Sequence, residues 1–295
     1  MKVAVTTPTG NIGRTLTGHL LDRGADVVLL ARDPAKVREF TDRGATVHQG
    51  TLDDESYVIA ATTGVDALFW LTPANYGAED FRAYQKTLGK IAAAAVTANK
   101  IGRVVDLSSI GAHHASGTGP IAGLHDVEKA LEGTGANVTH LRPAYFMENF
   151  LFSAESIVRE GAVFLPAPAT MAFPMIATTD IGKAAADRIL DESWSGTTVL
   201  ELIGPKNVSL EDATATISKG IGRDIKYVAV TPEQAAAAMT SNGMGDDIVK
   251  LYVEMYGAFT TGKIAPETSN PVKTATTFDS FVANVFRPGF EAMTK

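Results

Sequence analysis

The sequence predicts an α/β protein with a doubly wound parallel sheet and a smaller C-terminal α/β domain. Three observations lead to this fold class. The chain opens on an apolar strand, a glycine turn and a helix that leads to a second strand; strands and helices then alternate; and this rhythm changes from Phe150 onward. We expect one domain over residues 1–150 and a substrate domain over 151–295, with segments near 175–203 packing back on the first domain.

The first unit has the length and order of half a dinucleotide-binding domain. Residues 2–6 read as a buried strand and residues 7–13 as a tight turn, after which apolar residues recur at helical spacing. Residues 26–31 form a second buried strand that ends at Arg32. This succession is typical of the Rossmann fold, so residues 1–150 are predicted to be an NAD(P)-binding Rossmann domain.

Gly10 and Gly13 are the residues of the turn that would let a pyrophosphate approach the backbone at the start of a helix. A third glycine usually precedes them, but Thr7 stands at that position. A β-branched residue rarely adopts a positive φ, and Pro8 favours an extended residue before it. We therefore expect the turn to differ locally or to be extended at Thr7. The alternative, a turn that merely joins strand to helix, is disfavoured by the strands on both sides.

The end of the second strand indicates which dinucleotide binds. NAD sites usually carry an acidic residue there, whereas NADP sites carry a cation for the 2′-phosphate. Arg32 therefore favours NADP(H) over NAD(H). Asp33 weakens this argument, but we interpret it as the cap of a helix that begins at Pro34. Thr179 and Thr231 are expected to cap two later helices.

The composition excludes several classes of function. The 295 residues are 45% hydrophobic, carry a net charge of -7 and include no cysteine. Disulfides, thiolate metal sites and a cysteine nucleophile are therefore excluded, and no metal-ligand spacing is present. The acidic balance argues against direct nucleic-acid binding. With no apolar run of membrane-spanning length and no visible secretory signal, we expect a cytoplasmic protein without a membrane partner; a homo-oligomer stays open.

The predicted strands end in residues suited to ligand binding. In a doubly wound sheet, ligands lie outside the carboxyl ends of the strands. The segments that follow these ends are 7–13, Arg32, Asp53, 72–76, 108–109 and 142–149.

Several short motifs follow one another along nearly the whole chain. They are VTTPTGNIG at 5–13, ARDPAK at 31–36, Leu-Asp at 52–53, VEKAL at 127–131, LRPAYFMENF at 141–150, DIG at 180–182 and TPE at 231–233. In this order they resemble the NmrA-like branch of the atypical short-chain dehydrogenases. The resemblance implies a Rossmann domain, a small C-terminal substrate domain and NADP(H) in the cleft between them.

Similar members include NADPH quinone reductases, triarylmethane-dye and azo reductases, and benzylic ether reductases; others bind the dinucleotide without known chemistry and act as redox sensors. By match to the family pattern, residues 9–13 would contact the pyrophosphate, Arg32 the 2′-phosphate, and residues 143–146 the nicotinamide. Leu52 and Asp53 would flank the adenine. The full set of expected cofactor-binding residues is Thr7, Thr9, Gly10, Asn11, Ile12, Gly13, Arg32, Leu52, Asp53, Leu71, Thr72, Pro73, Ser108, Lys129, Pro143, Tyr145 and Phe146.

The catalytic residues are less well marked. Ordinary short-chain dehydrogenases use a Tyr-x-x-x-Lys pair, and no such pair stands on the helix expected after Ser109. His125 and Lys129 lie four apart and share a helix face, so His125 is a candidate proton donor and Lys129 a candidate ribose ligand. Many relatives carry this residue one position earlier, so a solvent-facing His125 remains an alternative. Ser109, His125 and Tyr145 are the candidate donors of a hydrogen bond to the reduced oxygen.

Two functions follow from these residues. The first is an NADPH-dependent oxidoreductase that transfers hydride to a quinone or a similar flat conjugated acceptor, aromatic polyketide-type compounds included. Residues 161–174 and the aromatic stretch 252–259 would form its acceptor pocket, although the latter is also consistent with ordinary core packing. The alternative is a non-catalytic NAD(P)-binding redox sensor that acts through a protein partner. A sugar-nucleotide epimerase is disfavoured by the missing tyrosine.

Overall fold

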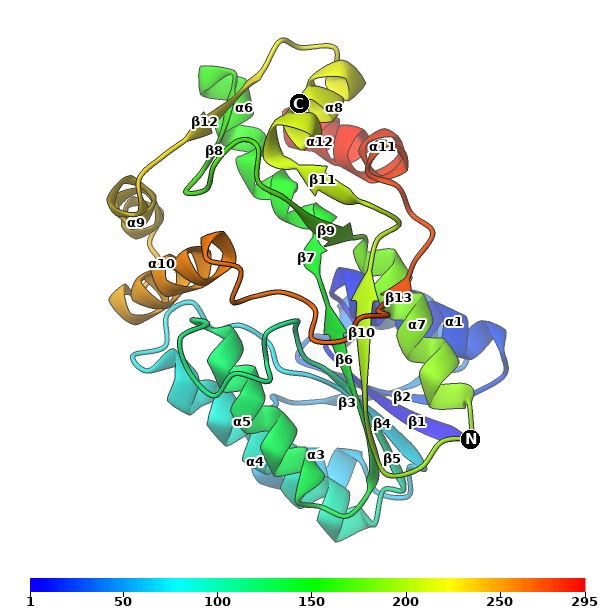
Figure 1. Cartoon of the computed structure of the whole chain (residues 1–295). Coiled ribbons are helices and arrows are strands. Elements are labelled where there is room, and N and C mark those ends of the chain that lie inside the picture. Colours follow the sequence, from blue (N-terminus) through cyan, green and yellow to red (C-terminus); the bar gives the residue numbers. More distant parts are fainter. Residues whose placement is uncertain (295) are drawn as a thin grey trace.

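The computed structural model describes residues 1–294 and has two lobes (Figure 1). The larger lobe is built on an eight-stranded sheet of order β13-β10-β6-β5-β4-β1-β2-β3. All neighbours in this sheet pair in parallel, and β1 lies between β4 and β2, which is the switch point of a doubly wound sheet. The predicted Rossmann architecture is confirmed. The strands are β1 (Lys2–Thr6), β2 (Asp26–Ala31), β3 (Thr46–Gln49), β4 (Ala67–Leu71), β5 (Arg103–Leu107), β6 (Asn137–Pro143), β10 (Thr197–Ile203) and β13 (Val272–Lys273).

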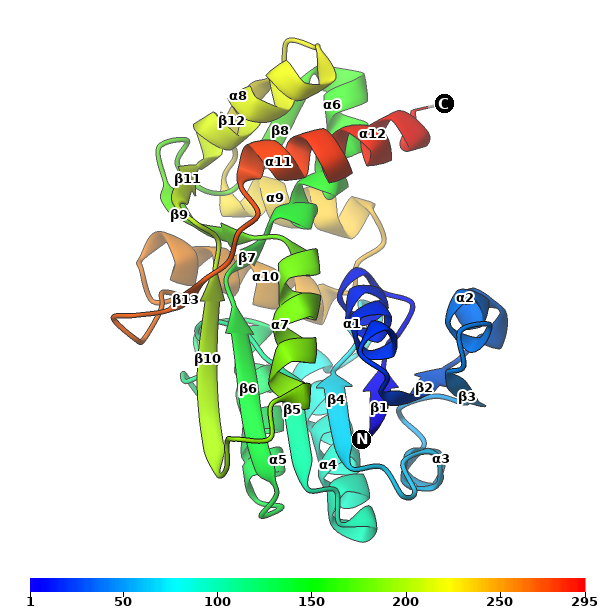
Figure 2. The ribbon, with the colours of Figure 1, turned by 90° about the vertical axis from the view of Figure 1, so that its right-hand side faces the viewer.

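Helices cover both faces of this sheet, and its central strands are accordingly almost continuously apolar (Figure 2). One face is covered by α1 (Asn11–Asp22) and α7 (Thr178–Leu190), the other by α3 (Glu55–Ala61), α4 (Phe81–Asn99) and α5 (Ile121–Glu132). A short turn of helix, η1 (Pro34–Val37) with α2 (Arg38–Thr41), joins β2 to β3. Among residues 1–294 no helix is both long and apolar enough to cross a membrane.

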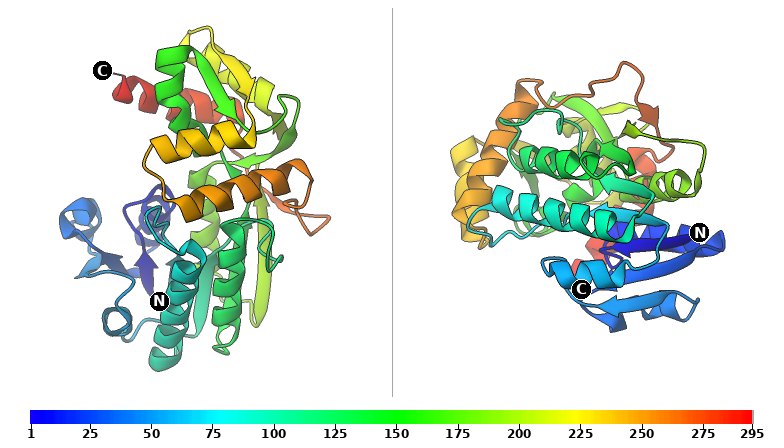
Figure 3. Two further views of the ribbon diagram at one scale, coloured as in Figure 1. Left: turned by 90° about the vertical axis from the view of Figure 1, so that its left-hand side faces the viewer. Right: turned by 90° about the horizontal axis from the view of Figure 1, so that it is seen from below.

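The smaller lobe has its own aromatic core around Phe150, Phe278, Phe281 and Phe286. Two long helices, α9 and α10, lie along one side of the molecule, and α10 runs where the lobes meet (Figure 3). The elements of this lobe are β7 (Tyr145–Phe146), η2 (Met147–Ser153), α6 (Ala154–Glu160), β8 (Ala162–Leu165), β9 (Ala172–Ile176), β11 (Asn207–Ser209), α8 (Leu210–Ile221), β12 (Lys226–Ala229), α9 (Pro232–Ser241), α10 (Asp246–Thr260), α11 (Phe278–Phe281), η3 (Val282–Phe286) and α12 (Arg287–Met293).

The chain passes between the lobes several times. β6 leads almost directly into β7; α7 and β10 return to the large lobe, and β13 closes the edge of its sheet. α7 packs tightly on α1, since a Cβ at Gly182 would lie 2.7 Å from the Thr15 side chain and 2.8 Å from the carbonyl oxygen of Ile12. The small lobe is therefore assembled from several separate stretches of sequence.

Two of the three predicted helix caps are confirmed. Asp33 accepts a hydrogen bond from the N–H of Ala35, and Thr231 forms a reciprocal capping box with Gln234. The prediction for Thr179 is wrong, because α7 begins one residue earlier. Its first N–H, that of Thr178, donates instead to the buried carboxylate of Glu148, which comes from the other lobe.

Candidate functional site

The turn between β1 and α1 is tighter than the sequence suggests. Thr7 has φ of 49°, in the left-handed region, so the expected extended conformation is wrong. This conformation directs the Thr7 carbonyl oxygen under the start of α1, where it accepts the N–H of Gly10 at 3.2 Å. A Cβ at Gly13 would lie only 2.2 Å from that oxygen, so glycine is required there. The close approach of turn and helix outweighs the local preferences of Thr7 and Pro8.

The start of α1 offers unpaired hydrogen-bond donors. Gly10 is its N-cap and supplies no side-chain cap, no acidic residue lies in its first turn, and residues 9–11 are exposed. Beside them the Thr7 hydroxyl oxygen is buried and has no hydrogen-bond partner among residues 1–294. Ile12 points into the core and holds the helix against the sheet. Free N–H groups at a helix start and an unsatisfied hydroxyl suit the pyrophosphate of a dinucleotide.

Arg32 lies exposed at the tip of β2. It forms no ion pair within the part of the chain that the structure describes. The neighbouring Asp33 is engaged as a helix cap, and the side chain of Gln49 donates to the Arg32 carbonyl oxygen across the ends of β2 and β3. The guanidinium is therefore free to meet a phosphate.

The residues expected to contact the adenine and the ribose lie after β3 and at the end of β4, on the same edge of the sheet. Leu52 is half-buried against the core, while Asp53 is exposed and bonded to Thr51. Thr72, just after β4, accepts the indole N–H of Trp70 at 3.0 Å, which fixes the start of that loop. Leu71 and Pro73 on either side of Thr72 are half-buried. All these residues follow carboxyl ends of parallel strands.

A buried ion pair lies behind the ends of β5 and β6. The Arg142 guanidinium donates to Glu128 of α5 at 2.9 and 2.7 Å, and Ser108 donates to the same carboxylate at 2.5 Å. Burial raises the pKa of Glu128, but the Arg142 hydrogen bond, the His140 charge and the Ser108 hydrogen bond outweigh it, so the pKa lies below its ordinary value. The Ser108 hydroxyl is thus tied inward, and Ser109 donates to the carbonyl of Ile110 at 3.1 Å.

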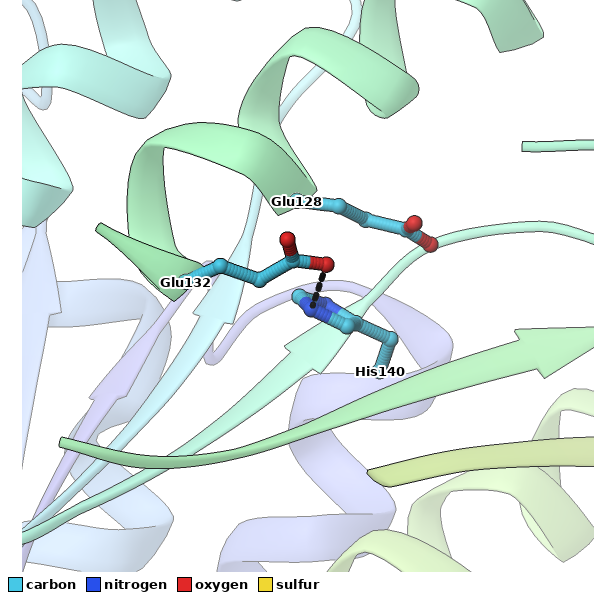
Figure 4. Close-up of side chains that lie close together, drawn as sticks. All are labelled: Glu128, Glu132 and His140. Carbon is cyan, nitrogen blue, oxygen red and sulfur yellow. Dashed lines mark ion pairs between the residues drawn. The ribbon is translucent and has the colours of Figure 1, made fainter. Parts of the chain in front are cut away.

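The pair belongs to a larger group of charged side chains on α5 and β6, which we call the α5–β6 network. Its members are Glu128, Glu132, His140 and Arg142. Figure 4 shows Glu128 and Glu132 of α5 and His140 of β6 pointing toward one another. One carboxylate oxygen of each glutamate and one ring nitrogen of His140 all lie within 4.8 Å of one another. Such a triad has the donor set of a metal site. However, Arg142 holds both oxygens of Glu128, and Lys129 donates to Glu132 at 2.7 Å. The acidic charge is already balanced by these cations, and the arrangement is that of an ion-pair network.

His140 is the most deeply buried member of the α5–β6 network. Its Nδ1 lies 3.0 Å from a carboxylate oxygen of Asp106, and neither side chain reaches solvent. Burial lowers the pKa of His140, but the hydrogen bond and charge of Asp106, together with the charges of Glu128 and Glu132, outweigh it. The pKa of His140 therefore lies above its ordinary value.

The two candidates of the α5 helix have other partners within the protein. Lys129 is exposed and paired with Glu132, and its contact with the ribose stays a prediction. His125 is half-buried and its Nδ1–H donates to the carbonyl oxygen of Ala112 at 2.8 Å, which excludes the solvent-facing alternative. With Nδ1 as the donor, a neutral His125 has a bare Nε2 and can give a proton only as imidazolium.

A small apolar hollow, with a volume of about 10 Å³, lies beside β7. Its aromatic lining consists of Tyr145, Phe173, Tyr256 and Phe259, and aliphatic residues of 165–171 with Leu210 complete it. We call it the Tyr145 hollow. It brings together the two segments that the sequence suggests for an acceptor pocket. Burial raises the pKa of Tyr145 well above its ordinary value, so its hydroxyl stays protonated at neutral pH.

The expected nicotinamide residues connect this hollow to the edge of the large sheet. Pro143 is the last residue of β6, and its carbonyl oxygen accepts the N–H of Ile110 at 3.1 Å. Phe146, two residues before Glu148, is half-buried against the large core. A ring lying on residues 143–146 would thus have the Tyr145 hollow on one side and the loop after β5 on the other.

A second, wider hollow lies at the outer edge of β10, between Glu201 and residues 267–272. Glu201 is buried there, and its carboxylate accepts the N–H groups of Glu267 and Thr268. Its charge is satisfied by the backbone, and the hollow lies away from the glycine turn, so we assign it no role in binding the cofactor.

Comparison with known proteins agrees with this architecture. Residues 1–282 match the model of the NmrA-like family. The chain belongs to the NmrA-like family. The resemblance inferred from the short motifs is therefore confirmed.

Relatives of known activity share most of this NmrA-like chain. The NAD(P)H azoreductase of Xenophilus azovorans is 29% identical over 84% of both chains. Quinone oxidoreductase 2 of Escherichia coli (strain K12) is 28% identical over 85% of this chain and 86% of its own.

Solved structures with the same fold include an NADPH-dependent quinone oxidoreductase from Escherichia coli, with a TM-score of 0.77 and 23% identity. The triphenylmethane reductase of Citrobacter sp. in complex with NADP(H) superposes with a TM-score of 0.80 at 18% identity. Each alignment covers 96% of this chain and 99% of the other. At these identities the likeness shows the fold.

Glu128, Glu132, His140 and Arg142 are not among the site residues expected from the sequence. Two signals for the α5–β6 network are present in this NmrA-like chain. His140 and Arg142 alternate with apolar residues along β6 and so share one face, and Glu128 and Glu132 lie four apart on α5. A strand face with cations opposite a helix face with carboxylates predicts a buried ion-pair layer.

Proposed function

We propose that this chain is an NADPH-dependent oxidoreductase that transfers hydride to a quinone or a similar flat conjugated acceptor. The use of a nicotinamide cofactor in a reduction is supported by the azoreductase and quinone oxidoreductase relatives, each similar over more than four fifths of the chain. The observation that carries the proposal is the position of the Tyr145 hollow, which directly adjoins the residues expected at the nicotinamide.

The preference for NADPH over NADH rests on Arg32. An exposed guanidinium without an ion-pair partner at the end of β2 matches the 2′-phosphate of NADPH, and the one carboxylate next to it is occupied as a helix cap. The glycine turn would hold the pyrophosphate on the N–H groups of residues 11–13 at the start of α1.

The proposed reaction is balanced by one hydride and one proton. A bound nicotinamide supplies the hydride, and the quinone with one proton from solvent becomes a hydroquinone. The residues here chiefly orient the two partners and exclude water, which is where much of the rate gain of such a reaction arises. The Tyr145 hydroxyl, kept neutral by burial, would donate a hydrogen bond to the developing oxyanion. Because the quinone spreads that charge, no stronger acid is needed.

The test is oxidation of NADPH by the pure protein with a panel of quinones, run beside NADH and repeated with Arg32→Glu. We expect turnover with NADPH, slower turnover with NADH, and at least a tenfold loss of kcat/KM for NADPH in the variant, because the change removes a cation and adds repulsion. Equal losses with NADPH and NADH would remove Arg32 from the 2′-phosphate site.

Absence of turnover with every quinone, together with NADPH binding in the same cuvette, would contradict the enzymatic proposal. A dinucleotide sensor that acts through a protein partner would then be the better interpretation. A control with NADPH and no acceptor distinguishes quinone reduction from direct oxidation by oxygen.

A further inference from the structure

The Tyr145 hollow has a lining without a charged side chain. Its rings come from three separate elements: Tyr145 from β7, Phe173 from β9 and Phe259 from α10. The Tyr145 ring lies 5.2 Å from that of Phe173 and 6.3 Å from that of Phe259, at interplanar angles of 74° and 80°. The hollow between these side chains measures about 10 Å³, so a further flat ring enters it only when they turn apart, and it then packs against their faces and edges.

We propose that the Tyr145 hollow selects neutral flat acceptors and excludes anionic ones. The inference rests on the proposed function and names the acceptor class of that site. Its basis is the chemistry of the lining, which offers aromatic and aliphatic side chains and nothing that pairs with an anion.

The hydroxyls of the lining stay neutral. Burial raises the pKa of Tyr256 to about 12 and that of Tyr145 well above its ordinary value. Neutral hydroxyls do not balance the charge of a sulfonate or a carboxylate. An anion desolvated without a charge partner is strongly disfavoured.

Two charged side chains near α10 are engaged elsewhere. Glu254 accepts the N–H of Gly119 at 3.2 Å, and Lys263 donates to the carbonyl oxygen of Ser116 at 2.9 Å. Both therefore hold the loop after β5 against α10, and neither is among the residues that line the hollow.

The first experiment compares binding of 1,4-naphthoquinone and 1,4-naphthoquinone-2-sulfonate to the protein loaded with NADP⁺. In this state no hydride is available, so affinity is measured apart from redox potential. The chain has no cysteine, so neither compound is consumed by a thiol. We expect the sulfonate to bind at least tenfold more weakly by calorimetry.

The second experiment places a cation in the hollow. Met171 lines it and is half-buried, so the head of an arginine in Met171→Arg can be accommodated without unfolding. We expect the ratio of the two dissociation constants to shift by at least tenfold in favour of the sulfonate. Met171→Gln changes the side chain without adding charge and should keep the original preference, and Phe152→Arg adds the same charge at a site 83% exposed and outside the hollow. Unchanged NADP⁺ affinity verifies the fold of each variant.

Equal affinities of the wild-type protein for the two compounds, or a preference unmoved by Met171→Arg, would overturn this inference while leaving quinone reduction intact. Failure of both compounds to bind would remove the hollow as the acceptor site. Absence of NADPH turnover with all quinones, measured separately, would instead contradict the proposed function itself.

Discussion

Gly10 and Gly13 look alike in the sequence but differ in what requires them. Gly13 is required by the protein itself, since a Cβ there would collide with the Thr7 carbonyl oxygen. Gly10 has an ordinary extended conformation, with φ of -79°, and a Cβ there would find no protein atom nearer than 3.7 Å. Space at Gly10 is therefore available for a ligand.

This difference gives a prediction. Gly10→Ala should change the free energy of unfolding by less than about 1 kcal/mol, because its Cβ fits, and should weaken NADPH at least tenfold, because the pyrophosphate must approach that Cα. Gly13→Ala, the matched change, should destabilise the fold by about 1–3 kcal/mol through overpacking. Urea unfolding and NADPH fluorescence titration measure the two effects. Wild-type NADPH affinity in Gly10→Ala would mean that the turn has a structural role alone.

Local sequence rules account for much of the site, and Thr7 marks their limit. Asp33 and Thr231 are caps because their partners lie two and three residues away, within reach of a local pattern. The conformation of Thr7 is set by the helix that lies over its carbonyl, and this outweighs the preference that Pro8 imposes. Likewise, Glu148 caps α7 from 30 residues away, a distance at which no local signal exists.

At the scale of elements, α5 and β6 are joined by buried charge as well as by apolar contacts. Val127 and Leu131 of α5 pack with Val138 of β6, while Glu128 meets Arg142 on the same interface. A buried ion pair is costly to break from one side, because the partner is left desolvated and uncompensated.

Glu128→Gln should therefore destabilise the protein by about 3 kcal/mol or more. Glu155→Gln is the matched control: its partner Arg159 is 71% exposed. The control should change stability by less than about 1 kcal/mol. Chemical denaturation of both variants tests this, and similar small losses in the two would show that the α5–β6 network contributes little to stability.

Some of these elements can be recognised from the sequence, and others cannot. β1, β2 and β4 are apolar runs bounded by turns, and their period and length make them recognisable. β13 has two residues and both are exposed, so neither periodicity nor burial marks it. It is a strand only because β10 is beside it.

For the molecule as a whole, the buried His140 links stability to pH. Its ring faces Asp106 of β5 and the carboxylates of Glu128 and Glu132 on α5, and its pKa in the folded protein lies above the ordinary value of 6.5. The folded state thus holds this proton more tightly than the unfolded chain. The resulting stabilisation is complete below pH 6.5 and is lost as the pH rises through the folded pKa.

The prediction is measured as a difference. The free energy of unfolding of the wild type minus that of His140→Gln should fall steadily between about pH 6 and pH 9. Using the difference cancels the titration of groups common to both proteins. A difference that stays level, or grows with pH, would mean that His140 is neutral in the folded state.

During synthesis, the large sheet stays incomplete until residues 272–273 have left the ribosome. β6 is made by residue 143, yet the strand that covers its outer side, β10, ends at residue 203, and β13 follows only at 272–273. In the interval β6 is an edge strand, with one row of backbone groups unpaired. A fragment that stops near residue 150 keeps this open edge and lacks α7, the helix packed on α1. The first half of the sequence, although it contains the whole glycine turn, therefore lacks α7, β10 and β13, which complete the large lobe.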